Sequence, residues 1–192
     1  MNKSRLEAFS DGVLAIIITI MVLEIHIPHS ADWESILPLL SVFSSYALSF
    51  IFIAIYWGNH HHLLHTVKAV SPGIIWANMH LLFWLSLIPF ATGWMGENRY
   101  SRNTVIVYAV LLLVCGIAFT ILQITIQKTN ELSAQLEEAF VVVRRKGIIS
   151  VICYSAAIGF AFLNTIISGI LFVLVAAMWI IPDKNIEKAL KG

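Results

Sequence analysis

The chain has 192 residues, of which 59% are hydrophobic and 12% are charged, and its mean hydropathy is +0.85. Soluble domains contain about 45–50% apolar and about 25% charged residues, so the composition excludes a soluble globular protein and indicates an integral protein of the lipid bilayer. Twelve Lys and Arg against eleven Asp and Glu give a net charge of +1, which provides no electrostatic basis for binding nucleic acid. Residues 1–192 are expected to form a single transmembrane domain.

Apolar segments alternate with short polar connections along the whole chain. Six such segments occur, at about 8–27, 37–57, 74–95, 103–123, 147–163 and 166–182. The predicted fold class is therefore all-α integral membrane, with six transmembrane helices per chain. Asn164 and Thr165 alone separate the last two segments, which predicts a tight helical hairpin, although a re-entrant pair fits the same residues. Pro89 is expected to kink or loosen the third span, and the periodicity of residues 127–146 predicts a helix that continues the fourth span into the cytoplasm.

The basic residues predict the orientation of the chain. Six spans place both termini on one side of the membrane, and Lys and Arg concentrate on the cytoplasmic side of membrane proteins. The connections on the side of the termini contain Lys3, Arg5, Lys68, Lys128, Arg144, Arg145, Lys146, Lys184, Lys188 and Lys191. The other side contains only Arg99 and Arg102, so both termini are predicted to be cytoplasmic.

Motifs of soluble enzymes and of common channels are missing from the sequence. It contains no P-loop, GxGxxG, GxSxG or HExxH pattern, which argues against an enzyme and against a nucleotide-driven pump. The TVGYG motif of ordinary potassium channels is also missing, so a channel of this sequence must select ions with its side chains. Cys115 and Cys153 lie in apolar runs without a CxxC pair and are expected to be packed or lipid-facing thiols.

The first span combines an ionisable residue at its entrance with a continuous apolar stripe. Asp11 near membrane depth suggests a functional site, although an interfacial Asp at a helix N-terminus is an alternative. At 100° per residue, one set of side chains lies within about 60° of a common line, and Asp11 lies about 140° from it. That set consists of Gly12, Ile16, Thr19, Ile20 and Leu23. Asp11 and this stripe are therefore predicted to face different surroundings. The stripe faces either a symmetry axis or lipid and other helices.

Histidines cluster at the end of the second span, as His60, His61, His62 and His65. His61 and His65 have the i, i+4 spacing of metal ligands, but no carboxylate or thiolate in this segment completes a site. We therefore expect one or two imidazoles to hydrogen-bond a buried acid such as Asp11. Asn78 and His80 fall at the same depth in the third span and are expected to join this polar network.

The first span begins with Arg5, Phe9, Ser10 and Asp11, which are followed by the apolar run of residues 12–25. This pattern resembles the signature first helix of the transmembrane protein 175 family of potassium channels. Trp57, the His60–His61 pair and the third span with Trp76 and Asn78 are also similar to the family pattern. A single six-helix repeat resembles the prokaryotic members, which implies a homotetramer in a prokaryotic inner membrane.

The resemblance implies a potassium-selective cation channel that conducts passively through a pore lined by the first helix of each subunit, with no cofactor and no resident metal. By position, Ile16 resembles the hydrophobic constriction, Ile20 and Leu23 resemble the next apolar layers, and Thr19 resembles a hydroxyl position implicated in selectivity. Permeant potassium is then expected to pass near Ile16 and Thr19. An apolar ring favours the ion that loses water more easily, so modest selectivity is expected.

The family pattern further implies that Arg5, Ser10 and Asp11 tie the pore helix to the second and third helices. His60 or His61, His80 and Trp76 are the expected partners. Two other functions fit the residues alone. One is a proton-coupled secondary transporter using Asp11 and the histidine cluster, and the other is a metal-handling scaffold using residues 60–65.

Overall fold

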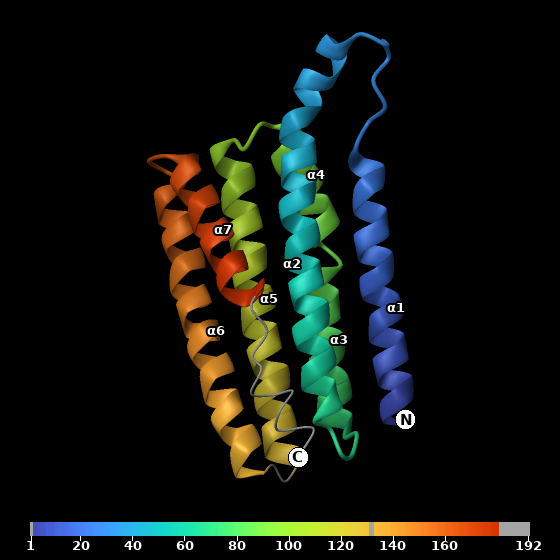
Figure 1. Ribbon diagram of the computed structural model, residues 1–192. Helices are drawn as coiled ribbons and strands as arrows, with labels where there is room; N and C mark the ends of the chain where they lie inside the picture. Colours follow the sequence, from blue (N-terminus) through green and yellow to red (C-terminus); the bar gives the residue numbers. More distant parts are fainter. Residues whose placement is uncertain (1, 131–132, 181–192) are drawn as a thin grey trace.

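The computed structural model describes residues 2–130 and 133–180, and all regular elements in these ranges are helical. In chain order they are α1 (Lys3–Met21), η1 (Val22–Glu24), η2 (Trp33–Leu39), α2 (Leu40–His65), α3 (Pro72–Leu85), α4 (Ile88–Glu97), α5 (Arg102–Thr129), α6 (Ala134–Phe160) and α7 (Thr165–Ile180). Figure 1 shows an elongated bundle in which α1 lies at one edge, α6 and α7 lie at the other, and α5 lies between them and α2–α4. The predicted all-α class is confirmed.

Four helical segments of the described chain are long and apolar enough to cross a membrane. They are Lys3–Glu24, Trp33–His65, Pro72–Glu97 and Arg102–Thr129. α6 has 27 residues but begins with a polar stretch, and α7 is apolar but has only 16 residues, so the six-span count stays a prediction. The last residues of the predicted sixth span, 181 and 182, lie outside the described ranges.

The third span is divided into two helices, as Pro89 predicts. α3 ends at Leu85 and α4 begins at Ile88. Proline has no N–H for the helical ladder, and its ring collides with the carbonyl four residues earlier, which here belongs to Leu85. The interruption lies inside the bundle, where both Leu85 and Ile88 are fully buried.

The polar connection after the fourth span differs from the prediction. Residues 127–146 do not form one continuation of α5, because α5 ends at Thr129 and α6 begins at Ala134. The side chain of Asn130 accepts hydrogen bonds from the backbone N–H groups of Lys68 and Ala69, at 2.8 and 3.1 Å, and thereby fixes the end of α5 to the α2–α3 connection. Ser133 then caps the new helix. Most of the predicted polar helix is therefore the first part of α6.

The predicted hairpin of the last two segments is present. α6 ends at Phe160, and the Asn164 side chain accepts a hydrogen bond from the backbone N–H of Ile166 at the start of α7. The hydroxyl of Ser168 donates to the carbonyl of Ala157 at 2.7 Å and joins the two helices near the turn. The two helices lie side by side in Figure 1.

Basic residues lie at both ends of the bundle but in unequal numbers. The start of α1 with Lys3 and Arg5, the α2–α3 connection with Lys68 and the end of α5 with Lys128 share the lower end in Figure 1. The α4–α5 connection lies at the opposite end and contains Arg99. These residues lie on the sides assumed for the orientation, whereas Arg144, Arg145 and Lys146 lie inside α6 and not in a connection, so the orientation stays a prediction. The C-terminal residues Lys184, Lys188 and Lys191 lie outside the described ranges.

Candidate pore helix and its polar contacts

The two faces of α1 have different surroundings within the chain. One face is buried against α2–α4 and consists of Leu6, Ser10, Leu14, Ile17 and Met21. The opposite face is exposed and continues into η1; we call it the outer stripe, and it consists of Gly12, Ile16, Thr19 and Ile20 of α1 and Leu23 of η1. Ile16 is 58% exposed and Leu23 is 76% exposed, although both are large apolar side chains. α1 therefore presents an apolar surface that its own chain leaves uncovered.

Thr19 supplies the hydroxyl group of the outer stripe. Its Oγ1 lies 3.0 Å from the carbonyl oxygens of both Ala15 and Ile16, so its hydrogen is directed to the backbone of its own helix. The lone pairs of the oxygen stay available on the exposed side. Thr19 therefore presents a hydrogen-bond acceptor on the exposed side of α1 without a change of rotamer.

Three buried polar side chains join α1, α2 and α3. Asn78 donates from Nδ2 to Ser10 Oγ at 2.9 Å, and its Oδ1 lies 2.6 Å from His60 Nε2. The Ser10 hydroxyl donates to the carbonyl of Leu6, so it accepts from Asn78. Because the Asn78 oxygen can only accept, His60 donates from Nε2. All three side chains are almost inaccessible to solvent, and we call them the Ser10–Asn78–His60 chain.

Asp11 has a different partner from the one expected. Its Oδ1 accepts a hydrogen bond from the indole N–H of Trp57 on α2 at 2.9 Å. The prediction that an imidazole hydrogen-bonds this carboxylate is wrong. The carboxylate accepts from Trp57, and the buried imidazole of His60 contacts Asn78 instead. Asp11 and Ser10 are neighbours on α1 but contact α2 through two separate hydrogen-bonded groups.

The other residues expected in the network lie elsewhere. His61 is exposed and packs between the rings of Trp57 and His65, at centroid distances of 6.1 and 6.0 Å. His80 is exposed and accepts a hydrogen bond from the indole of Trp84 in its own helix. Trp76 is 73% exposed.

The remaining two signature residues, Arg5 and Phe9, are also exposed. Phe9 is 47% exposed, and no hydrogen bond or ion pair of the Arg5 side chain is found within residues 2–130 and 133–180. Of the residues that the family pattern brings together, the structure therefore joins Ser10, Asn78 and His60 in one group and Asp11 with Trp57 in another.

Sequence reasoning missed a third contact at the start of α1. Glu7 Oε1 lies 3.9 Å from both Lys3 Nζ and His65 Nδ1, and Lys3 also donates to the carbonyl of His65 at 2.6 Å. The signal was in the spacing: Glu7 and Asp11 are four residues apart, as are Trp57, His61 and His65. Side chains four residues apart share one helix face, so the two acids of α1 oppose one face of α2.

Among the described residues, no group of three or more His, Cys, Asp or Glu side chains is placed to hold a metal ion.

Comparisons with known proteins identify the family. The family described as the endosomal/lysosomal potassium channel TMEM175 matches residues 5–89, which contain most of α1, all of α2 and α3, and both hydrogen-bonded polar groups. A protein of Chryseobacterium sp. strain P1-3 that is named a potassium channel is 50% identical over 191 residues, with 100% of this chain and 99% of that protein covered. The chain belongs to the TMEM175 family.

Further matches extend this assignment to the whole bundle. A protein of Streptomyces collinus named a potassium channel is 31% identical over 141 residues, covering 69% of this chain and 68% of its own length. The crystal structure of a lysosomal potassium-selective channel TMEM175 homolog from Chamaesiphon minutus has a TM-score of 0.81 at 26% identity and covers 94% of this chain and 97% of that one. The family resemblance seen in the sequence is confirmed, and the α6–α7 hairpin is part of the TMEM175 channel fold.

Proposed function

We propose that this protein conducts potassium ions passively through a pore lined by the outer stripe of α1, with Ile16 at its narrowest point. The matching family is described as a potassium channel and the bacterial relatives are named potassium channels, so the protein is a potassium channel and not an enzyme. The observation that supports the position of the pore is the asymmetry of α1. Its inner face is fixed by hydrogen bonds to α2 and α3, whereas its outer stripe is apolar and uncovered.

The outer stripe has the chemistry that a side-chain pore needs. A ring of Ile16 side chains excludes water when it is narrow, and an ion must lose part of its hydration to pass. Ile20 and Leu23 would add further apolar rings, while the Thr19 oxygen could replace part of the lost hydration. Potassium releases its water more easily than sodium, so the proposed ring favours potassium. No bound cofactor is required for this passage.

We propose a homotetramer in which four α1 helices surround the pore. An open groove of about 590 Å³ runs beside the outer stripe, between α1 and α4, and Ile16, Ile20, Phe90 and Trp94 are among the residues that line it. A neighbouring subunit that fills this groove would cover apolar side chains of both helices. We further propose an inner-membrane location with the lower end of Figure 1 in the cytoplasm, because that end carries the excess of basic residues.

Flux measurements with Ile16→Asn test the proposed constriction. Asn keeps a similar size but attracts water, so a dewetted ring should become hydrated and potassium flux should increase several-fold. The assay uses purified protein in liposomes with an outward potassium gradient, at equal protein incorporation. Ile152→Asn is the matched control, because Ile152 on α6 is 62% exposed and lies outside the proposed pore.

Two results would refute the constriction. Flux that is unchanged or lower in Ile16→Asn would remove Ile16 from the narrowest point, and an equal increase in Ile152→Asn would show a nonspecific effect of a polar residue. The proton-coupled transporter is not favoured, because Asp11 bonds Trp57 and the bacterial relatives are named potassium channels.

A further inference from the structure

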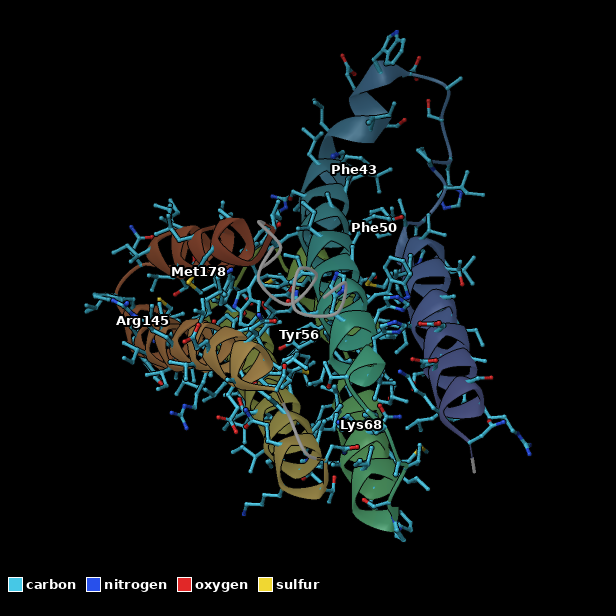
Figure 2. The ribbon with its side chains drawn as sticks, turned by 60° about the horizontal axis from the view of Figure 1, so that its bottom comes forward. Phe43, Phe50, Tyr56, Lys68, Arg145 and Met178 are labelled. Atoms are coloured by element: carbon cyan, nitrogen blue, oxygen red, sulfur yellow. The ribbon has the colours of Figure 1, made fainter. Side chains whose placement is uncertain are left out.

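A cavity lies on the side of α2 that is turned away from α1. Residues of α2, α5, α6 and α7 line it, it is partly open to its surroundings, and its free volume is about 40 Å³. Ile55 and Asn59 of α2 line it and lie about 160° around the helix from Trp57, which bonds Asp11. Figure 2 shows Tyr56, a third lining residue, between α2 and the α5–α7 group. The cavity is therefore separate from the outer stripe.

Most of the cavity wall is apolar and aromatic. Phe52 of α2, Phe119 of α5 and Trp179 of α7 contribute rings to it. None of the described residues that line it carries a formal charge, so the site offers no counter-charge for an ion. A charged ligand would lose its hydration there without compensation.

Several polar groups in the wall have unused hydrogen-bonding capacity. Neither the Tyr56 nor the Tyr154 hydroxyl makes a hydrogen bond within the part of the chain that the structure describes, and Tyr154 is only 3% exposed. Gln123, also 3% exposed, donates a long hydrogen bond of 3.3 Å to Phe140, which leaves its side-chain oxygen as a free acceptor. By contrast, the buried hydroxyl of Tyr108 is paired with Ser49 at 2.8 Å. The buried hydroxyl of Tyr108 thus has a partner within the bundle, whereas those of Tyr56 and Tyr154 have none among the described residues.

We propose that this cavity is a binding site for a small neutral alcohol, whose hydroxyl bonds Tyr56 or Tyr154 and whose carbon atoms contact the aromatic wall. The free volume is sufficient for about three water molecules, and hence for a molecule of about three heavy atoms. A hydrocarbon of the same size would leave the hydroxyls unpaired, whereas an alcohol both donates and accepts a hydrogen bond.

The test is a direct location of ethanol, which has three heavy atoms, in crystals of the protein. Difference density between crystals grown with and without ethanol should show the molecule in the cavity, with its oxygen within hydrogen-bonding distance of Tyr56 or Tyr154. A parallel titration of the purified protein with ¹³C-labelled ethanol, followed by saturation-transfer NMR, measures binding in solution.

Three variants separate the contribution of the cavity's free volume to alcohol binding from the contribution of its tyrosine hydroxyls. A Cβ atom added at Gly116 lies 4.0 Å from the Tyr56 hydroxyl oxygen, so Gly116→Val fills the cavity and should abolish binding. Gly159→Val is the matched control, because a Cβ there meets nothing within 4 Å and the residue is not part of the cavity wall. The double variant Tyr56→Phe/Tyr154→Phe keeps the space but removes both hydroxyls, and it should weaken binding at least several-fold.

The outcomes decide the proposal independently of potassium conduction. Ordered water alone in the wild-type cavity, or binding at crystal concentration only, would overturn it. Binding that survives Gly116→Val, or that is unchanged in the double Phe variant, would also overturn it. If Gly116→Val does not fold, Gly116→Ala replaces it, because its Cβ makes only an ordinary contact, and a partial loss of affinity is then expected.

Discussion

α1 and α7 are both held to their neighbours by hydrogen bonds, but the bonds differ in what they connect. The contacts of α1 join side chains that are far apart in the sequence, such as Ser10 with Asn78 and Asp11 with Trp57. At the start of α7, Ser168 bonds a backbone carbonyl only eleven positions earlier in the chain. Long-range bonds between side chains fix both the rotation and the depth of α1 relative to two other helices. Among the described residues, the side-chain hydrogen bonds of α7 to other helices reach α6 alone, through Ser168 near the turn and through the indole of Trp179, which donates to Ser150 Oγ at 2.9 Å, so they only hold a hairpin together.

This difference has a physical reason. In a membrane, apolar helices gain little from burying Leu and Ile against each other, because lipid is equally apolar. Polar side chains have few suitable partners there, so they specify one arrangement. A helix whose outer stripe must keep one rotation needs such contacts, whereas a hairpin is already restricted by its short connection. The largest functional effects are therefore expected from changes at the inner face of α1.

Asn78→Leu should have the largest effect. It removes both hydrogen bonds of the Ser10–Asn78–His60 chain, which leaves the buried His60 N–H without an acceptor and the Ser10 oxygen without a donor, and should lower the free energy of unfolding by about 2 kcal/mol. Potassium flux at equal incorporation should fall strongly, because α1 loses its side-chain hydrogen bond to α3. Thermal unfolding in detergent and liposome flux measure the two effects. Asn98→Leu is the control, since the Asn98 amide bonds only the carbonyl of Trp94 in its own helix.

Trp57→Phe should have an intermediate effect. Phe keeps an aromatic ring but cannot donate to Asp11, so stability should fall by about 1 kcal/mol and flux should be reduced rather than lost. Trp76→Phe is the matched control, because Trp76 is exposed and has no hydrogen bond among the described residues. The same assays apply. Equal effects of the two substitutions would contradict the assignment of Trp57 as the partner of Asp11.

The sequence was sufficient to predict those features of the fold that depend on neighbouring residues. Apolar length predicted the long helices, Pro89 predicted the break before Ile88, and the 100° periodicity separated the outer stripe from Asp11. The boundary between α5 and α6 could not be predicted in the same way. It depends on the Asn130 side chain, which bonds backbone groups more than 60 positions away.

The candidate site was predictable in composition but not in pairing. Ser10, Asn78 and His60 fall at a common depth in three spans, which the sequence indicated. Which imidazole turns inward depends on the rotation of α2 relative to α3, and no local pattern specifies that rotation. His60 and His61 differ by 100° around α2, and only the packed bundle shows that His60 is buried while His61 is exposed.

Ser168→Ala should have the smallest effect, and it tests the local hydrogen bond between α7 and α6. The substitution removes the hydroxyl that bonds Ala157, but the Ala157 carbonyl still accepts from the backbone N–H of Ala161 at 3.0 Å, so no acceptor is left unpaired. Stability should fall by about 0.6 kcal/mol, the mean measured for hydrogen bonds between membrane helices, and flux should be unchanged. Flux as low as in Asn78→Leu would mean that the hairpin also determines the position of the pore helix. The claim that the long-range bonds of α1 affect potassium flux more than the local bond of α7 would then be wrong.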